Sequence, residues 1–140
     1  MKMLKPIAID RSKPKEAITQ TLAEGSNRLS LGMYVLLFPE GTRGRPGKIL
    51  PFRTGTARFS IYLDKPILPA VIYGSHLVWP RGKLFFSWPR KIKVLILKPI
   101  YPTSFIKVKN PSEEAIKKAE KEITEFLENQ IKESAKLLYG

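Results

Sequence analysis

The stretch LLFPEGTRGRPGKILPFRTG, residues 36–55, joins a run of apolar residues to a dense group of polar and turn-forming ones. The apolar run ends at Phe38, and after Pro39 come a carboxylate, a glycine, a hydroxyl and a cation at residues 40–43. A second cation, Arg53, follows between a Pro-Phe pair and a Thr-Gly pair. Polar groups placed directly after a buried strand are typical of a ligand site, so this stretch bears on both fold and function.

The segments on either side of this stretch alternate between strand and helix patterns. Short apolar runs predict strands at residues 7–9, 33–38, 66–73, 83–88 and 91–97, and helical spacing predicts helices at residues 14–30 and 57–63. Because this order is typical of parallel β-α-β units, we expect an α/β fold with a mostly parallel sheet and flanking helices. We assign residues 1–110 to this domain.

A long amphipathic helix is predicted for residues 111–140. Asn110 is placed to cap it, Pro111 suits its first position, and Glu113 completes an arrangement like a capping box. One face of this helix carries the apolar residues Ile116, Ala119, Ile123, Phe126, Leu127, Ile131 and Leu138. We therefore expect the helix to pack on the α/β domain along that face.

Positive charge is the strongest feature of the composition. The net charge is +13, and residues 1–110 hold 20 cations against 5 acids, whereas residues 111–140 hold seven Glu and five Lys. Such an excess favours an anionic partner, which is nucleic acid, an anionic membrane, a phosphorylated substrate or an acidic protein. The alternative is a solvated basic surface without a partner.

Nucleic-acid binding would use the basic body together with Phe85, Phe86 and Trp88. However, the segment KLFFSWPRKIKVLIL, residues 83–97, alternates like a half-buried strand. No groove-reading or RNA-binding motif accompanies it. We therefore expect no nucleic acid among the partners.

The residue types that are missing exclude several kinds of chemistry. The chain has no cysteine and one histidine, His76, so disulfides, thiol catalysis, zinc–thiolate sites and sites with several histidines are excluded. We expect no metal site and no cofactor. No apolar run approaches the length of about 18 residues that a membrane span needs.

The residue types at 40–53 suit an oxyanion. Arg43 offers a planar fork of donors that matches phosphate, and Gly41 allows backbone N–H groups to approach a ligand closely. Glu40 can orient Arg43 or accept a hydrogen bond from a substrate hydroxyl, and Arg53 can close on the same phosphate. The alternative is a purely structural turn held by a Glu40–Arg43 ion pair.

The segments FPEGTR at residues 38–43, LPFRTG at residues 50–55 and PILPAVIYGS at residues 66–75 resemble the glycerolipid acyltransferases, which include the lysophosphatidate (1-acylglycerol-3-phosphate) acyltransferases. That family has four sequence blocks. The third is matched in full by residues 38–43, and the fourth, an apolar strand with prolines, by residues 66–71. Arg53 stands where the family usually has lysine. The resemblance runs from about residue 7 to about residue 102 and implies a partial glycerolipid acyltransferase fold.

The resemblance implies a set of site residues. The acceptor phosphate would be bound by Glu40, Gly41, Thr42, Arg43, Arg53 and Arg11, and the apolar acyl pocket would include Pro66, Ile67 and Pro69. Arg11 is assigned from the second block, where Ile9 also fits. Lys5 and Ala8 depart from that block, because the family has glycine and phenylalanine there.

The activity implied by the resemblance is acyl transfer in phospholipid biosynthesis. The donor would be acyl-CoA or acyl carrier protein, and the acceptor lysophosphatidate or a related glycerophosphate. We expect a cytoplasmic, peripheral protein at the cytoplasmic face of the membrane, where Lys83, Arg90, Lys91 and Lys93 would meet anionic headgroups. The alternative is a non-catalytic basic module that binds a membrane surface or an anion.

The first block of the family, Asn-His-x-x-x-x-Asp, has no match here. Its histidine is the general base, and its aspartate orients the imidazole. His76 follows the fourth block instead and has Arg81 in place of the aspartate, so we interpret it as a loop residue. We therefore predict no catalytic residue in these 140 residues, an N-terminally truncated domain, and a chain that alone is inactive.

Overall fold

The computed structural model describes residues 7, 14–42, 44, 48–78 and 91–139. The chain divides into two compact units, Met1–Leu37 and Phe38–Gly140. The predicted strand at residues 83–88, and all of that at residues 7–9 except Ile7, lie outside the described residues. The predicted domain division at residue 110 stays a prediction.

The first unit contains one helix, α1 (Pro14–Ser30), among its described residues, which confirms the helix predicted from apolar spacing. Its first turn holds Glu16 and its last turn Arg28, the signs that suit the two ends of a helix dipole. Gly32, with φ of 72°, ends it: the N–H of Gly32 donates to the carbonyl of Leu29, and the N–H of Met33 to that of Arg28. This Schellman arrangement needs the left-handed backbone that glycine supplies.

Residues 33–38, predicted to be a buried strand, have no strand assignment in the structure. Tyr34, Leu36 and Phe38 are 95%, 70% and 69% exposed, so the prediction of burial is wrong for the described chain. The apolar composition favours an extended backbone, but a strand also requires a hydrogen-bonded neighbour. No described segment supplies that neighbour.

The second unit contains a small sheet made of β1 (Ala70–Tyr73) and β2 (Lys93–Ile96). These strands confirm the predictions at residues 66–73 and 91–97, and they pair antiparallel, with Val71 opposite Leu95. The mostly parallel sheet is therefore not confirmed by the described residues. The helix described between the two strands, α3 (Ser75–Val78), is one turn long, whereas a parallel pair is joined by a crossover of about a dozen residues or more, usually with a longer helix.

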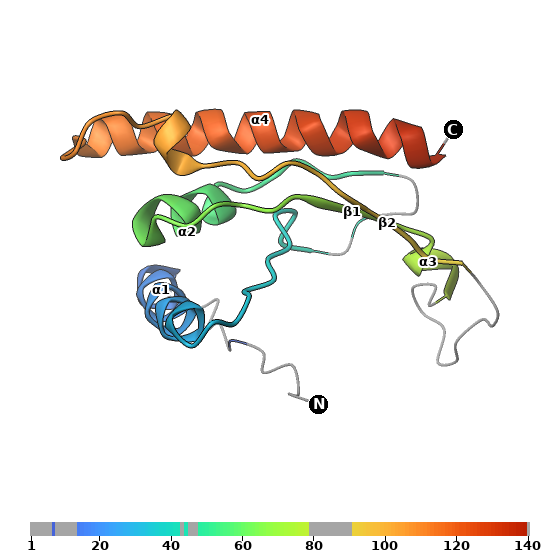
Figure 1. Ribbon diagram of the computed structural model, residues 1–140, viewed down its shortest axis with the longest axis horizontal. Coiled ribbons are helices and arrows are strands. Elements are labelled where there is room, and N and C mark those ends of the chain that lie inside the picture. The colour runs from blue at the N-terminus through green and yellow to red at the C-terminus, as the bar shows by residue number, and fades with distance from the viewer. Residues whose placement is uncertain (1–6, 8–13, 43, 45–47, 79–90, 140) are drawn as a thin grey trace. The chain divides into compact units, whose positions relative to one another are not determined.

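A long helix, α4 (Glu113–Tyr139), covers one face of this sheet and also packs against α2 (Gly55–Leu63). Figure 1 shows α4 running along β1 and β2, with the short 3₁₀ turn η1 (Pro102–Ser104) leading toward it. The cap of α4 differs from the prediction, because Ser112 accepts the N–H of Ala115 at 3.2 Å and the helix begins two residues after Pro111. None of the helices in the described part of the chain combines the length and apolar character that crossing a bilayer requires.

The core of the second unit lies between α4 and the sheet. Val71 and Ile100 pack from the sheet side against Leu127, Ile131 and Ala135 of α4. The buried positions on α4 recur at the helical spacing predicted from the sequence, since Ala119, Ile123, Leu127 and Ile131 are all buried. Phe126 is an exception: it is 44% exposed and meets Phe105 edge to face.

An ion pair fixes α2 to α4. Arg58 Nε donates to Glu120 Oε1 at 2.8 Å and Arg58 Nη2 to Glu120 Oε2 at 2.9 Å, and the Glu120 side chain is 5% exposed. This bidentate hydrogen bonding raises the pKa of the Arg58 guanidinium, against the opposing effect of its burial. The pair holds in place the helix that follows Arg53.

Candidate functional site

The residues after Phe38 form a tight turn. The N–H of Gly41 donates to the carbonyl of Phe38 at 3.0 Å, which closes a four-residue turn over Pro39 and Glu40. Proline suits the second position of such a turn because its ring fixes φ. Gly41 has φ of 67°, in the left-handed region that residues with a Cβ avoid.

Glu40 closes the loop that this turn begins. Its Oε2 accepts the N–H of Leu50 at 2.9 Å. A methyl group placed on Gly44 would lie 3.1 Å from the same oxygen, so the backbone passes close to the carboxylate there. Glu40 is therefore a structural acceptor within the loop, a role that the sequence interpretation did not include. Arg43 lies outside the described residues, so the Glu40–Arg43 ion pair remains an untested alternative.

Arg53, near the other end of the loop, contacts this turn. Its backbone N–H donates to the carbonyl of Pro39 at 2.9 Å. Its side chain lies against Gly41, because a methyl group built on that residue would come within 3.1 Å of Arg53 Cδ and Nε. The loop thus brings Glu40, Gly41 and an exposed guanidinium together, with Thr42 exposed beside them. Arg11 and Arg43 lie outside the described residues.

The N-terminus of α2 lies directly after Arg53. Thr54 occupies the N-cap position without making a side-chain cap, so the first-turn N–H groups receive no side-chain acceptor from it. The N-terminus of a helix carries a partial positive charge and attracts anions. A guanidinium and this helix end are therefore adjacent along the chain.

Glu128 of α4 anchors the same loop. Its Oε2 accepts the N–H of Phe52 at 2.8 Å, and its Oε1 accepts a hydrogen bond from Lys132, one helical turn further on. The bond from Lys132, supported by that from Phe52, lowers the pKa of the Glu128 carboxyl. Sequence reasoning missed this residue, because a Glu–Lys pair four residues apart on a helix looks like an ordinary surface pair.

The residues predicted for an acyl pocket differ from one another in their surroundings. Pro66 is exposed, Pro69 is buried, and Ile67 packs against the core and exchanges backbone hydrogen bonds with Ile100. Pro69 also accepts the N–H of Leu97 at 2.9 Å, so it helps to pair the ends of the sheet. Their part in an acyl pocket stays a prediction.

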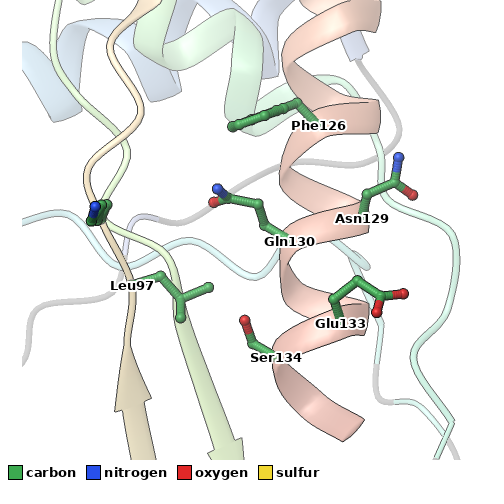
Figure 2. A pocket seen from close by; sticks show the side chains of 7 residues that line it. Leu97, Phe126, Asn129, Gln130, Glu133 and Ser134 are labelled. Atoms are coloured by element: carbon green, nitrogen blue, oxygen red, sulfur yellow. The ribbon is translucent and has the colours of Figure 1, made fainter. Parts of the chain in front are cut away.

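A groove of 420 Å³ lies elsewhere, between the end of β2 and α4. Figure 2 shows its lining, with Gln130 and Phe126 projecting from α4 and Leu97 facing them from the strand side. The Oε1 of Gln130 is buried without a hydrogen-bond partner. The groove contains none of the residues predicted for the acceptor site or the acyl pocket.

His76 belongs to α3, and among the described residues no group of three or more carboxylate or histidine side chains is placed to hold a metal ion. What the loop at residues 38–55 offers is cationic and hydrogen-bonding chemistry, suited to holding an oxyanion.

A family model described as Acyltransferase matches residues 1–73, which is just over half of the chain. The chain belongs to the acyltransferase family. The matched region includes the loop at residues 38–55, and the resemblance to the glycerolipid acyltransferases that was inferred from this loop is confirmed.

Curated relatives of this acyltransferase chain carry a common name. This chain is 38% identical over 94 residues to the 1-acyl-sn-glycerol-3-phosphate acyltransferase of Pseudomonas aeruginosa. The match covers 67% of this chain and 36% of the relative. With the enzyme of the same name from Limnanthes douglasii the identity is 39% over 95 residues, covering 67% and 33%. The chain thus spans about a third of the length of the curated relatives it matches.

A solved structure resembles this acyltransferase chain as well. The crystal structure of the 1-acyl-sn-glycerophosphate (LPA) acyltransferase PlsC from Thermotoga maritima superposes with a TM-score of 0.65 at 28% sequence identity. The match covers 85% of this chain and 44% of that one. This likeness confirms the α/β class of the fold.

Proposed function

We propose that this chain binds the acceptor in an acyltransferase of phospholipid biosynthesis. The enzyme would transfer an acyl group from acyl-CoA or acyl carrier protein to lysophosphatidate or a related glycerophosphate. The relatives' shared name, 1-acyl-sn-glycerol-3-phosphate acyltransferase, supports this substrate class. The proposal concerns a complete enzyme to which these residues contribute the phosphate site.

The observation that carries the proposal is the position of Arg53. Its guanidinium lies against Gly41, where no Cβ intervenes, and its backbone is tied to Pro39. A phosphate placed there would meet the guanidinium and the uncapped N-terminus of α2. Two sources of positive potential that follow one another along the chain suit a phosphomonoester, because that group carries close to two negative charges at neutral pH.

The finer expectations about fold and location form part of the same proposal. We infer that the complete domain has a mostly parallel sheet with flanking helices. We place the enzyme at the cytoplasmic face of the membrane, because its lipid acceptor resides in bilayers and the chain carries a net charge of +13. The alternative is a non-catalytic basic module that binds a membrane surface or an anion, and the internal use of the Glu40 carboxylate supports it.

Binding of sn-glycerol 3-phosphate, measured by titration calorimetry on the 140-residue chain, tests the site. Arg53→Gln should weaken binding about ten- to a hundredfold, the effect of losing one charge-assisted hydrogen bond. Arg28→Gln removes the same charge from α1 and serves as the control, with an expected change below about twofold. Equal affinities for the parent chain and Arg53→Gln would remove the basis of the proposal.

Addition of acyl-CoA and lysophosphatidate to the same preparations tests whether this chain alone supplies a general base. A chain with its own base would form the diacyl product, whereas a chain that contributes only the acceptor site would bind the acceptor without product. Binding that depends on Arg53 without turnover is the result we expect for this chain taken alone.

A further inference from the structure

Backbone hydrogen bonds from three N–H groups hold the segment that carries Arg53. Those of Leu50 and Arg53 donate to acceptors inside the loop at residues 38–55. The third, that of Phe52, donates to Glu128 Oε2 at 2.8 Å, across 76 positions of the sequence. Of these three acceptors, Glu128 alone belongs to α4, so its carboxylate ties the segment to that helix.

The side chains of Phe52 and Arg53 have different surroundings. Phe52 is partly buried and packs against the hydrophobic core, whereas Arg53 is exposed and lies against Gly41. The N–H that Glu128 accepts belongs to the residue directly before Arg53, and α2 begins two residues after Arg53. Glu128 thus acts on the backbone from which the guanidinium extends.

The Glu128 side chain is itself fixed. It is 20% exposed, and while its Oε2 accepts the N–H of Phe52, its Oε1 accepts a hydrogen bond from Lys132, one turn along α4. Hydrogen bonds to a carboxylate are charge-assisted and stronger than neutral ones. A carboxylate held at both oxygens is therefore a well-defined attachment point for the loop.

The helix α4 also holds the chain on the other side of Arg53. There Arg58 of α2 is bound by Glu120 through two hydrogen bonds of 2.8 and 2.9 Å. One helix thus supplies the carboxylate that binds Phe52 before Arg53 and the carboxylate that binds Arg58 after it. The position of Arg53 relative to α4 depends on both.

We propose that Glu128 is a positioning residue for the acceptor phosphate, because by binding the N–H of Phe52 it holds Arg53 in the place from which the guanidinium binds the phosphate. This inference rests on the proposed function, since it concerns the same site. It deepens that function by giving a role to a residue of α4, which contains none of the sequence blocks that resemble the family. The competing account is that Glu128 only stabilises the fold.

The sign of the effect separates positioning from charge. A carboxylate near an anion site repels the ligand, so its removal should strengthen phosphate binding if charge alone mattered. Positioning has the opposite consequence, because a released segment must be ordered again when the phosphate binds. Ordering the backbone of one residue lowers affinity about five- to thirtyfold.

Titration of the 140-residue chain with sn-glycerol 3-phosphate compares three substitutions of Glu128. Glu128→Leu removes the acceptor and should lower affinity about tenfold. Glu128→Asp keeps the charge but shortens the side chain by a methylene group, and should lower affinity about fivefold. Glu128→Gln keeps the length and an acceptor oxygen, and should restore affinity to within about threefold of the parent.

The matched control is Glu133→Leu, which removes a carboxylate of the same helix that pairs with Lys136. It should change affinity by less than about twofold. If Glu128→Leu leaves affinity unchanged or raises it, or if Glu128→Asp binds as tightly as Glu128→Gln, the positioning role is wrong.

A double-mutant cycle shows whether Glu128 acts through Arg53. If it does, Glu128→Leu should change affinity less than about twofold in a chain that already carries Arg53→Gln, followed by NMR so that weak binding is measurable. Equal losses in the two backgrounds would mean that Glu128 supports the fold in general, and would overturn the proposal.

Hydrogen exchange supplies a readout at the attachment point itself. Glu128→Leu should speed exchange of the Phe52 amide about tenfold or more and leave the amide of Ile100, which donates to Ile67, unchanged. Equal acceleration at both amides would contradict a local role.

The two proposals fail in different ways. If Arg53→Gln weakens binding and Glu128→Leu does not, the positioning role is wrong and the phosphate site stands. If the parent chain and Arg53→Gln bind sn-glycerol 3-phosphate equally, the phosphate site is wrong and the positioning role falls with it.

Discussion

Substituting Gly41 by alanine separates the backbone requirement of the loop from its ligand chemistry. Gly41 has φ of 67°, and left-handed backbone costs a residue with a Cβ about 1–2 kcal/mol. The added methyl group would also lie 3.1 Å from Arg53 Cδ and Nε, which is tighter than an ordinary contact. Because these atoms belong to a flexible, exposed side chain, Arg53 can move away, and the guanidinium is displaced rather than the backbone.

We therefore expect Gly41→Ala to have two distinct effects. The free energy of unfolding, measured by urea denaturation, should fall by about 1–2 kcal/mol from the backbone cost. The affinity for sn-glycerol 3-phosphate should fall about tenfold or more, because the displaced guanidinium no longer meets the phosphate in its fixed position.

Two other glycines provide matched controls. Gly32 has φ of 72° but nothing within 4 Å of an added methyl group, so Gly32→Ala carries the backbone cost without touching Arg53. Gly55 begins α2, again with open space around it, and Gly55→Ala should be neutral or should stabilise by up to about 1 kcal/mol. Gly41→Ala with unchanged affinity, or Gly32→Ala with an equal loss of affinity, would refute the reasoning.

Further outcomes are expected from substitutions outside the turn. Glu120→Gln should lower the free energy of unfolding by about 3 kcal/mol, because it leaves the partly buried Arg58 without its carboxylate partner. Arg58→Met together with Glu120→Leu should recover part of that loss. If Glu120→Gln is as stable as the parent, this account of the ion pair is wrong. Glu128 has a pKa below its ordinary value of 4.5, so the stability it contributes is complete above that value and is lost as the pH falls through the lower folded pKa. Glu128→Gln should flatten this acid limb in urea midpoints measured across pH, and an unaltered limb would argue against the anchor. The 140-residue chain alone should show no family-like acyl transfer, and robust transfer that His76→Ala abolishes would show that His76 is the base after all.

The helices and the paired strands followed from local signals. Apolar spacing predicted α1 and α4, and the two apolar runs that became β1 and β2 were also located from the sequence. Local rules failed at the start of α4, where Ser112 rather than Asn110 accepts the capping N–H. Both residue types cap helices well, so which of them becomes the N-cap depends on where the preceding turn ends.

Contacts between residues that are far apart in the sequence could not be predicted. The antiparallel pairing of β1 with β2 is a tertiary fact that the alternation of strand and helix patterns did not contain, and Glu128 contacts Phe52 across 76 positions in the sequence. The motif placed Glu40 in the loop, but only the structure shows that its carboxylate accepts the N–H of Leu50. A carboxylate's partners depend on how a loop folds back, which a linear pattern does not encode.

The use of Glu40 within the loop separates acceptor binding from proton transfer. It is the sole carboxylate between residues 25 and 63, and one of its oxygens is committed to the backbone at Leu50. A general base must be free to reach the acceptor hydroxyl at about 3 Å and must be oriented by a partner of its own. Among its described residues the loop uses one oxygen of Glu40 for its own backbone, and with Arg53 and the start of α2 it provides what an anion needs. Affinity for the acceptor should therefore depend on Gly41 and Arg53, whereas the rate of acylation should depend in addition on a base supplied by residues other than this loop.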